Sequence, residues 1–160
     1  MKKRSFQMPV TVKLDDILEG MEAQGEEISS YLNKRTGKVV TIMDEEFMYA
    51  EEDEHLDSLS DWQKDMVLVA KEIMETDDYI KLPDQFEINE YQIMENFCFS
   101  LPDDKLREMM YNSIKGKGAF GRFKENIHRF GIADNWYAYR ERARRKIAIG
   151  WCEYNGISYT

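Results

Sequence analysis

Few residues in this sequence belong to the types that most often do chemistry, and none stands at the spacing of a familiar catalytic or metal-binding motif. The histidines are His55, in an acidic stretch, and His128, in a basic segment. Neither has a second ligand-type side chain at the spacing of a zinc site. The sequence also lacks a G-x-S-x-G nucleophile elbow, an H-E-x-x-H helix and a phosphate-binding loop that ends in Lys-Ser or Lys-Thr. Enzymatic activity would therefore require a site assembled from residues far apart in the chain.

Acidic side chains are concentrated between residues 44 and 57, a stretch that carries carboxylates at 44–46, 51–54 and 57. Oxygen-rich clusters of this kind can bind Ca²⁺ or Mg²⁺. This stretch, however, lacks the Asp-x-Asp-x-Asp-Gly spacing and the terminal Glu of a calcium loop, and three apolar or aromatic residues interrupt it. We therefore predict a solvent-exposed acidic loop, and we expect neither a metal ion nor a cofactor in the chain.

The most informative segment runs from Tyr139 to Lys146 and is rich in arginine. We expect a helix there, and at about 100° of rotation per residue its apolar face consists of Trp136, Tyr139, Ala143, Ile147 and Trp151. Arg142, Arg145 and Lys146 fall outside that face and should point to water. Arg140 begins within the face, where a guanidinium needs a partner to offset its desolvation. We expect Arg140 to pair with a carboxylate from residues 1–102, and contact with an anionic ligand is the alternative.

A second apolar face follows the glycines at 116 and 118 and consists of Phe120, Phe123, Ile127 and Phe130. Exposed aromatic rings can stack on nucleobases, but rings at helical spacing normally belong to a core. We therefore predict that these residues are buried. The glycine-rich string at 116–121 is interpreted as a break between helices, with binding of a phosphate group as the alternative.

The formal net charge of −9 is distributed unevenly along the chain. Residues 1–102 carry 10 basic and 24 acidic side chains, a net of −14, whereas residues 103–160 carry 12 basic and 7 acidic ones, a net of +5. A local basic face can bind a nucleic acid even when the whole protein is acidic. Alternatively, the two parts neutralise each other within one fold.

The length of 160 residues fits one domain over 1–160, with an acidic α/β part (1–102) and a basic helical part (103–160). No apolar run approaches the roughly 20 residues that span a bilayer. The basic N-terminal segment has no apolar core or cleavage site of a secretion signal. Cys98 and Cys152 are expected to be reduced and buried, and a disulfide between them is the alternative. We therefore expect a cytoplasmic protein with no membrane partner.

The pattern along the chain places strands first and helices later. Strands are expected at 8–13, 28–33, 38–43 and 79–82, and the second and third should form a hairpin that turns at Gly37. Helices are expected to begin at Leu14, Ser60, Asn89, Pro102 and Asp134, with a short helix between the break at Gly116 and Gly118 and its end at Gly131, and the last should end near Tyr154. This order predicts an α+β fold with a small N-terminal antiparallel sheet and a C-terminal helical bundle.

Several strings in the sequence carry a resemblance to a known family. They are GAFGRFK at 118–124, WYAYR at 136–140 and AIGWC at 148–152, with Asn155-Gly156-Ile157 after them and the hairpin at 31–40 before them. Through these strings the chain resembles a bacterial family of unknown function, the uncharacterised protein family 0158. The resemblance leads us to expect a basic residue at position 121, but this chain has a glycine there. The resemblance implies a bacterial-type cytosolic protein and supplies no activity and no catalytic residues.

The sequence favours a non-enzymatic binding or regulatory module whose partner is a protein, because surfaces of opposite charge steer macromolecular encounters. Two alternatives remain, namely a nucleic-acid-binding protein that uses the basic C-terminal helical face and an enzyme with a dispersed site. The candidate binding residues are all basic, and they are Arg122, Lys124, Arg129, Arg140, Arg142, Arg145 and Lys146. No residue is a candidate for catalysis or for binding a metal.

Overall fold

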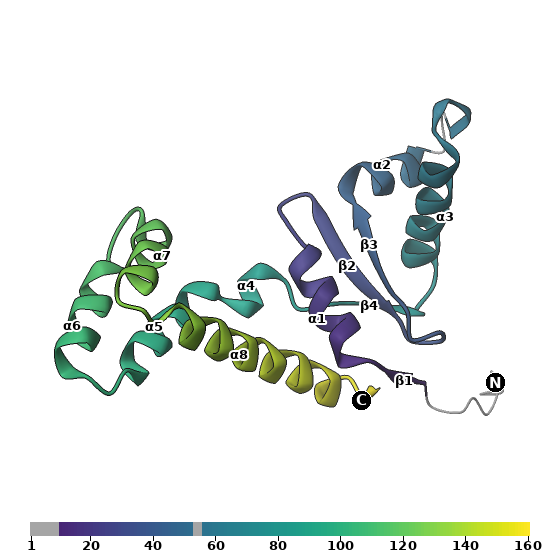
Figure 1. Cartoon of the computed structure of the whole chain (residues 1–160). Helices are drawn as coiled ribbons and strands as arrows, with labels where there is room; N and C mark the ends of the chain where they lie inside the picture. The colour runs from purple at the N-terminus through teal and green to yellow at the C-terminus, as the bar shows by residue number, and fades with distance from the viewer. Residues whose placement is uncertain (1–9, 53–55) are drawn as a thin grey trace. The chain divides into compact units, whose positions relative to one another are not determined.

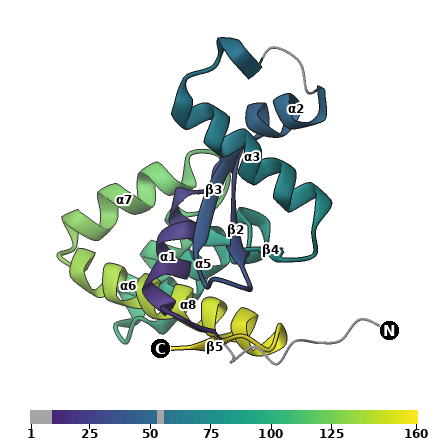
Figure 2. The same cartoon turned by 90° about the vertical axis from the view of Figure 1, so that its right-hand side faces the viewer.

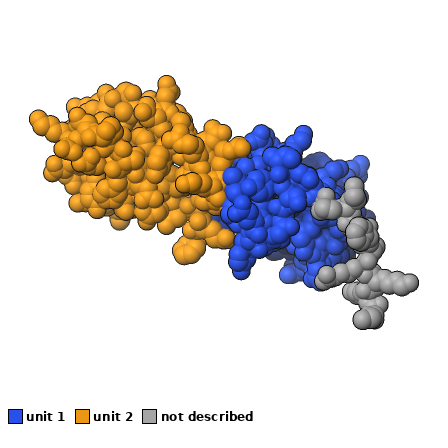
Figure 3. All heavy atoms as spheres, turned by 90° about the horizontal axis from the view of Figure 1, so that it is seen from below, with its two compact units in different colours: residues 1–84, 148–160 blue, residues 85–147 orange. Residues whose placement is uncertain are grey.

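A computed structural model describes residues 10–52 and 56–160 of the chain. The chain divides into two compact units, which Figure 3 shows in different colours. Unit 1 comprises residues 1–84 and 148–160, and unit 2 comprises residues 85–147. Whether the chain behaves as one domain stays a prediction, and each unit is described by itself.

A three-stranded antiparallel sheet with the strand order β3-β2-β4 lies at the centre of unit 1 (Figure 1). The predicted hairpin is confirmed as β2 (Ile28–Asn33) and β3 (Val39–Met43), and β4 (Tyr79–Lys81) pairs with the other edge of β2. Gly37 has a φ of 75° in the hairpin turn, a conformation that side chains with a Cβ rarely adopt.

Helices cover both faces of this sheet. On the face that carries Ser30 and Leu32 lies α1 (Leu14–Ala23), and the Ser30 hydroxyl donates to the Gly20 carbonyl at 2.7 Å. On the opposite face, Ile42 packs in one core cluster with residues of α2 (Asp44–Glu52) and α3 (Asp61–Glu75). A short 3-10 helix, η1 (Leu56–Ser58), precedes α3. The predicted capping box of α3 is present, because the Ser60 side chain accepts from the Gln63 N–H and the Ser60 N–H donates to Gln63 Oε1 at 3.4 Å.

The acidic stretch forms the helix α2 over residues 44–52, so the predicted loop is wrong there. Phe47 and Ala50 lie at helical spacing and pack into the cluster around Ile42, which stabilises a helix in spite of its carboxylates. Glu46 is buried, and its Oε2 accepts a hydrogen bond from the Met43 N–H at 2.7 Å. This bond satisfies a backbone donor at the start of the helix. Residues 53–55, which include His55, lie outside the described residues.

The close approach of α1 to the sheet depends on the absence of a side chain at Gly20. A Cβ at this position would lie 2.6 Å from Leu82 Cδ1 and 2.7 Å from Val39 Cγ1. Gln24, just beyond the helix, donates from Nε2 to the Pro83 carbonyl at 2.6 Å. The end of α1 is thereby fastened to the segment that follows β4.

The C-terminal residues form a short strand beside the first described strand (Figure 2). β1 (Thr11–Val12) and β5 (Ser158–Tyr159) pair in parallel, and the Thr160 N–H donates to the Val12 carbonyl at 2.9 Å. The sequence predicted only helices after the strand at 79–82, and β5 shows that this prediction is wrong at the C-terminal end. A strand of two residues is too short to leave an alternating pattern in the sequence.

The described secondary structure of unit 2 is entirely helical. Its elements are α4 (Gln85–Ile88), α5 (Glu90–Ser100), α6 (Asp104–Ser113), α7 (Ala119–Arg129) and the part of α8 (Ala133–Tyr154) that ends at residue 147. Asn89 caps α5 as predicted, since its Oδ1 accepts from the Gln92 N–H at 3.1 Å. Helix α6 is capped by Asp103 and begins at Asp104 rather than at Pro102, and Asp134 lies inside the first turn of α8. Together with the sheet of unit 1, these helices confirm the α+β class.

The predicted apolar face of α8 is correct only for part of the helix. Trp136 is buried, but Ile147 and Trp151 are half-buried, and the buried positions near the C-terminus are Ala148 and Cys152. Residues from 148 onward belong to unit 1, where the Trp151 Nε1–H donates to the Lys81 carbonyl at 3.2 Å. The helix therefore buries different faces in its two parts. On α7, Phe123 and Ile127 are buried as predicted, whereas Phe120 is 57% exposed.

Gly20 in α1 and Gly150 in α8 should respond in opposite directions to alanine. Gly150→Ala should stabilise the protein by about 1 kcal/mol, because no atom lies within 4 Å of the new Cβ and alanine favours the helix. Gly20→Ala should destabilise it by about 1 kcal/mol or more, because the new Cβ overlaps Leu82 and Val39. Urea unfolding of both variants measures the difference, and an equal gain at both positions would contradict the close approach of α1.

Candidate functional site

In unit 2, one carboxylate at the start of α5 accepts hydrogen bonds from two arginines of α8. Glu90 Oε1 accepts from Arg140 Nη2 at 2.9 Å and from Arg144 Nη1 at 2.7 Å, and Glu90 Oε2 accepts from Arg140 Nε at 3.2 Å. The side chain of Arg144 is 9% exposed, whereas those of Arg140 and Glu90 are 31% and 29% exposed. Partial removal from water strengthens the attraction and makes the loss of either partner costly.

This cluster confirms that Arg140 pairs with a carboxylate from residues 1–102. The helical wheel missed Arg144, which is the more deeply buried of the two arginines. The spacing of four residues between the two arginines could have identified Arg144 from the sequence, because positions i and i+4 lie on the same side of a helix and can reach one partner. Glu90 itself carried no distinguishing pattern in the sequence.

Aromatic rings from three helices meet around Phe97 of α5. Its ring centroid lies 5.4 Å from that of Trp136, 5.4 Å from that of Tyr139 and 6.0 Å from that of Phe123, all in edge-to-face geometry. Phe123 and Trp136 also contact each other, with centroids 4.7 Å apart. Edge-to-face pairs contribute about 0.5–1.5 kcal/mol each beyond their buried area. The rings therefore join α5, α7 and α8 into one rigid support.

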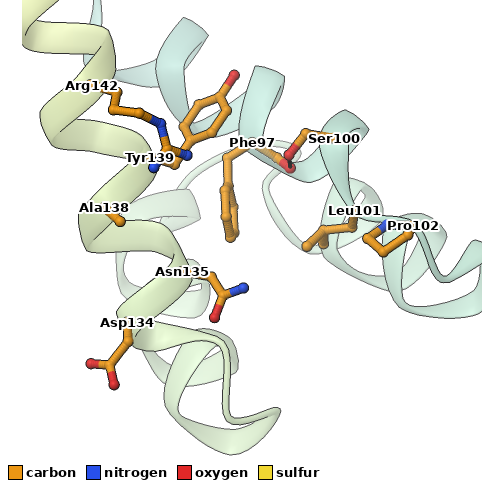
Figure 4. A pocket seen from close by; sticks show the side chains of 9 residues that line it. All are labelled: Phe97, Ser100, Leu101, Pro102, Asp134, Asn135, Ala138, Tyr139 and Arg142. Atoms are coloured by element: carbon orange, nitrogen blue, oxygen red, sulfur yellow. Dashed lines mark hydrogen bonds between the residues drawn. The ribbon is translucent and has the colours of Figure 1, made fainter.

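A pocket of about 410 Å³ lies beside this support, at the end of α5 and the first half of α8 (Figure 4). Its apolar lining consists of Phe97, Leu101, Pro102, Ala138 and the ring of Tyr139, and its polar lining consists of Ser100, Asp134, Asn135 and Arg142. In Figure 4, the Phe97 ring stands between the two helical segments, and the side chain of Asn135 points toward the same space. The pocket thus combines an aromatic wall with several hydrogen-bonding groups.

Charged residues stand at the two ends of the α8 segment that lines the pocket. Arg142 is exposed, and its guanidinium carbon lies 6.0 Å from the centre of the Tyr139 ring. Asp134 stands two turns earlier, and Figure 4 shows its carboxylate pointing away from Phe97. A bound group that reached Arg142 would therefore meet a cation held against an aromatic ring.

Among the candidate binding residues, Arg122 serves the chain's own backbone. Its Nε, Nη1 and Nη2 donate to the carbonyls of Ser113, Lys117 and Lys115 at 2.7, 2.6 and 2.7 Å. These carbonyls belong to the end of α6 and the turn before α7, where Gly116 and Gly118 have positive φ angles. The string GAFGRFK therefore forms the N-cap and the first turns of α7, and its Arg122 acts as a clamp that fixes the shape of the turn before this helix.

The remaining candidates lie on two helices. Lys124 and Arg129 are exposed on α7, and the Arg129 guanidinium carbon lies 5.6 Å from the centre of the Phe130 ring. Lys146 is exposed on α8, and Arg145 is half-buried rather than directed fully to water. Of the seven candidates, the structure places only Arg142 in the pocket and only Arg140 in the cluster around Glu90.

The described residues offer no assembled metal site and no activated thiol. In residues 10–52 and 56–160, no group of three or more His, Cys, Asp or Glu side chains is placed to hold a metal ion. Cys98 and Cys152 are free and buried, as predicted. Burial raises the pKa of the Cys98 thiol to about 11 and also raises the pKa of Cys152. Both thiols are therefore protonated at neutral pH and are poor nucleophiles. None of the helices in this described part is long and apolar enough to span a membrane.

Residues 7–160 match the family described as Uncharacterised protein family (UPF0158). The chain belongs to this family. It is also similar to a UPF0158 protein of Pseudomonas aeruginosa, with 22% identity over 150 residues that cover 93% of this chain and 86% of the relative. No solved structure matches the chain. The resemblance found in the sequence is thus confirmed, and a bacterial relative is established.

Three of the strings that carried the resemblance to the UPF0158 family contain residues with clear roles in the structure. GAFGRFK contains the arginine clamp and the buried Phe123, WYAYR contains Trp136 and Arg140, and AIGWC contains the buried Ala148 and Cys152. Each string therefore has a structural role in this member of the UPF0158 family. The pocket adds Arg142, which lies just outside those strings.

The exposures of the two arginines predict unequal effects on stability. Arg144→Ala should lower the free energy of unfolding by about 3 kcal/mol, because a nearly buried ion pair loses one partner. Arg140→Ala should cost about 1 kcal/mol, because its side chain is more exposed and Arg144 still pairs with Glu90. The exposed Arg142 provides the control, and Arg142→Ala should change stability by no more than about 0.5 kcal/mol. Chemical unfolding that found equal costs at 140 and 144 would contradict this assignment.

Proposed function

We propose that the chain is a cytoplasmic, non-enzymatic binding module whose pocket in unit 2 takes a segment of a partner protein. The segment combines one large apolar side chain, which enters the pocket, with an acidic side chain, which pairs with Arg142. The observation that carries this proposal is the placement of an exposed arginine at the edge of an aromatic-walled pocket of about 410 Å³. Pockets that bind specific ligands have volumes of about 300–1,000 Å³.

The composition of the pocket supports a peptide segment as its occupant. Tyrosine and arginine, with other aromatic residues, dominate the few positions that carry most of the binding energy in protein interfaces. Phe97 and Tyr139 line the pocket, and edge-to-face contacts with Phe123, Trp136 and Tyr139 restrict the Phe97 ring. A preorganised surface loses little conformational entropy on binding, which favours affinity.

The charge of unit 2 supports an acidic residue in that segment. Residues 85–147 carry 12 basic and 9 acidic side chains, so this unit has a net charge of +3 within an acidic chain. Arg145 and Lys146 follow Arg142 on α8. Their field attracts an acidic segment and raises its rate of association, especially at low ionic strength.

Selection of the full chain against a phage-displayed library of random peptides tests the proposal. Wild-type protein should enrich peptides in which a large apolar residue stands close to Asp or Glu. Arg142→Glu should weaken binding of the selected peptides about 30-fold, because it replaces the attraction to the acidic side chain of the peptide with repulsion. Ala138→Trp should weaken binding because the new ring fills the pocket. Lys124→Glu is the matched control, since it makes the same charge change on α7 outside the pocket.

The outcome also separates the proposed partner from a nucleic acid. A nucleic-acid-binding protein would bind random single-stranded RNA or DNA with strong salt dependence, and Lys124→Glu and Arg129→Glu would weaken that binding. The proposal is contradicted if no peptide is enriched, or if the same peptides bind Arg142→Glu and Ala138→Trp as tightly as wild type.

A further inference from the structure

The sheet of unit 1 has a strand edge that the described chain leaves open. β3 stands at the end of the strand order β3-β2-β4, and no other described strand pairs with its outer edge. The strand comprises Val39, Val40, Thr41, Ile42 and Met43, and it contains neither proline nor a charged residue. Natural sheets usually protect such edges with charges, proline or a bulge, because an open edge pairs readily with another strand.

The hydrogen-bond register identifies which backbone groups of β3 point outward. The Asn33 N–H donates to the Lys38 carbonyl, and the Asp44 N–H donates to the Glu27 carbonyl, so the even-numbered residues of β3 face β2. In an antiparallel pair the direction alternates, and residues 39, 41 and 43 therefore direct their N–H and C=O groups away from the sheet.

Only part of this outer edge is occupied within the described chain. The outward N–H of Met43 donates to Glu46 Oε2 at 2.7 Å. No described residue provides a hydrogen-bond partner for the outward N–H groups of Val39 and Thr41. Val39 and Thr41 are both half-buried. This exposure is expected for an edge strand in a sheet that is covered on both faces and open along its outer edge.

We propose that the edge of β3 pairs with the β3 edge of a second copy of this chain, in antiparallel orientation about a two-fold axis at Val40. In this register Val39 faces Thr41 of the second copy, and each pair exchanges two backbone hydrogen bonds. The open groups of Val39 and Thr41 are all satisfied, and the Met43 N–H keeps its bond to Glu46. The two three-stranded sheets become one continuous sheet, with a self-complementary interface.

Charge complementarity supports a second copy as the occupant. Antiparallel pairing about Val40 places Lys38 opposite Ile42 of the second copy and diagonal to its Asp44. Lys38 and Asp44 are both exposed, and their even numbers place them on the same face of the sheet. Diagonal neighbours lie about 7–8 Å apart, within the reach of a lysine side chain. The two-fold axis repeats this attraction at the other end of the strand.

A charge-exchange experiment on the full chain tests the proposed dimer. Sedimentation velocity over a range of micromolar concentrations should show wild-type protein at twice the mass of one chain. Lys38→Glu and Asp44→Lys should each weaken self-association about tenfold, because each change replaces attraction with repulsion at both ends of the pair. An equimolar mixture of the two variants should recover the wild-type association, since both ends then bring opposite charges together.

A proline variant tests the backbone contribution separately. Val39→Pro removes an outward N–H that the β2–β3 pairing does not use, so the hairpin should persist and the dimer should dissociate. Circular dichroism reports whether each variant is folded. Wild-type protein that remains monomeric over the whole concentration range would overturn the proposal, and so would a dimer that neither the charge variants nor, if folded, Val39→Pro weakens.

Discussion

The arrangement of unit 2 depends on the attraction between Glu90 and two arginines of α8. A carboxylate that accepts hydrogen bonds from Arg140 and Arg144 fixes where α8 lies along α5. That position determines how Trp136 and Tyr139 meet the ring of Phe97, and the rings of Phe97 and Tyr139 line the pocket. Because the Arg144 side chain is 9% exposed, displacing Glu90 would leave the Arg144 guanidinium buried without this carboxylate partner. The ion pair therefore disfavours arrangements of α5 and α8 that would separate Arg144 from Glu90.

Contacts within the chain explain part of its uneven charge distribution. Glu90 comes from the acidic residues 1–102 and neutralises arginines of the basic C-terminal part, as the sequence suggested for Arg140. Other basic groups serve the backbone, because Arg122 binds three carbonyls of the turn before α7. Arg142 and Lys146 remain exposed. These exposed groups, together with the aromatic pocket, support the proposed binding of an acidic partner segment.

The features that the sequence predicted well are those that depend on local physics. The β2–β3 hairpin follows from a β-branched run and a permissive glycine, and the starts of α3 and α5 follow from side chains that cap their own helix. Features that depend on packing between distant segments were missed. Helix α2 forms because Phe47 and Ala50 pack on the sheet, whereas its many acidic residues led to the prediction of a loop. The pocket and the role of Arg144 depend on which face of α5 meets α8, and periodicity does not specify a partner.

The coupling free energy between Glu90 and Arg144 tests this account most directly. A double-mutant cycle uses Glu90→Gln, Arg144→Gln and the double variant, with the free energy of unfolding measured for each and for wild type. The account predicts a coupling of about 2 kcal/mol or more, because the buried guanidinium and the carboxylate depend on each other. Additive effects, with a coupling within about 0.3 kcal/mol of zero, would show that the ion pair does not hold α8 against α5.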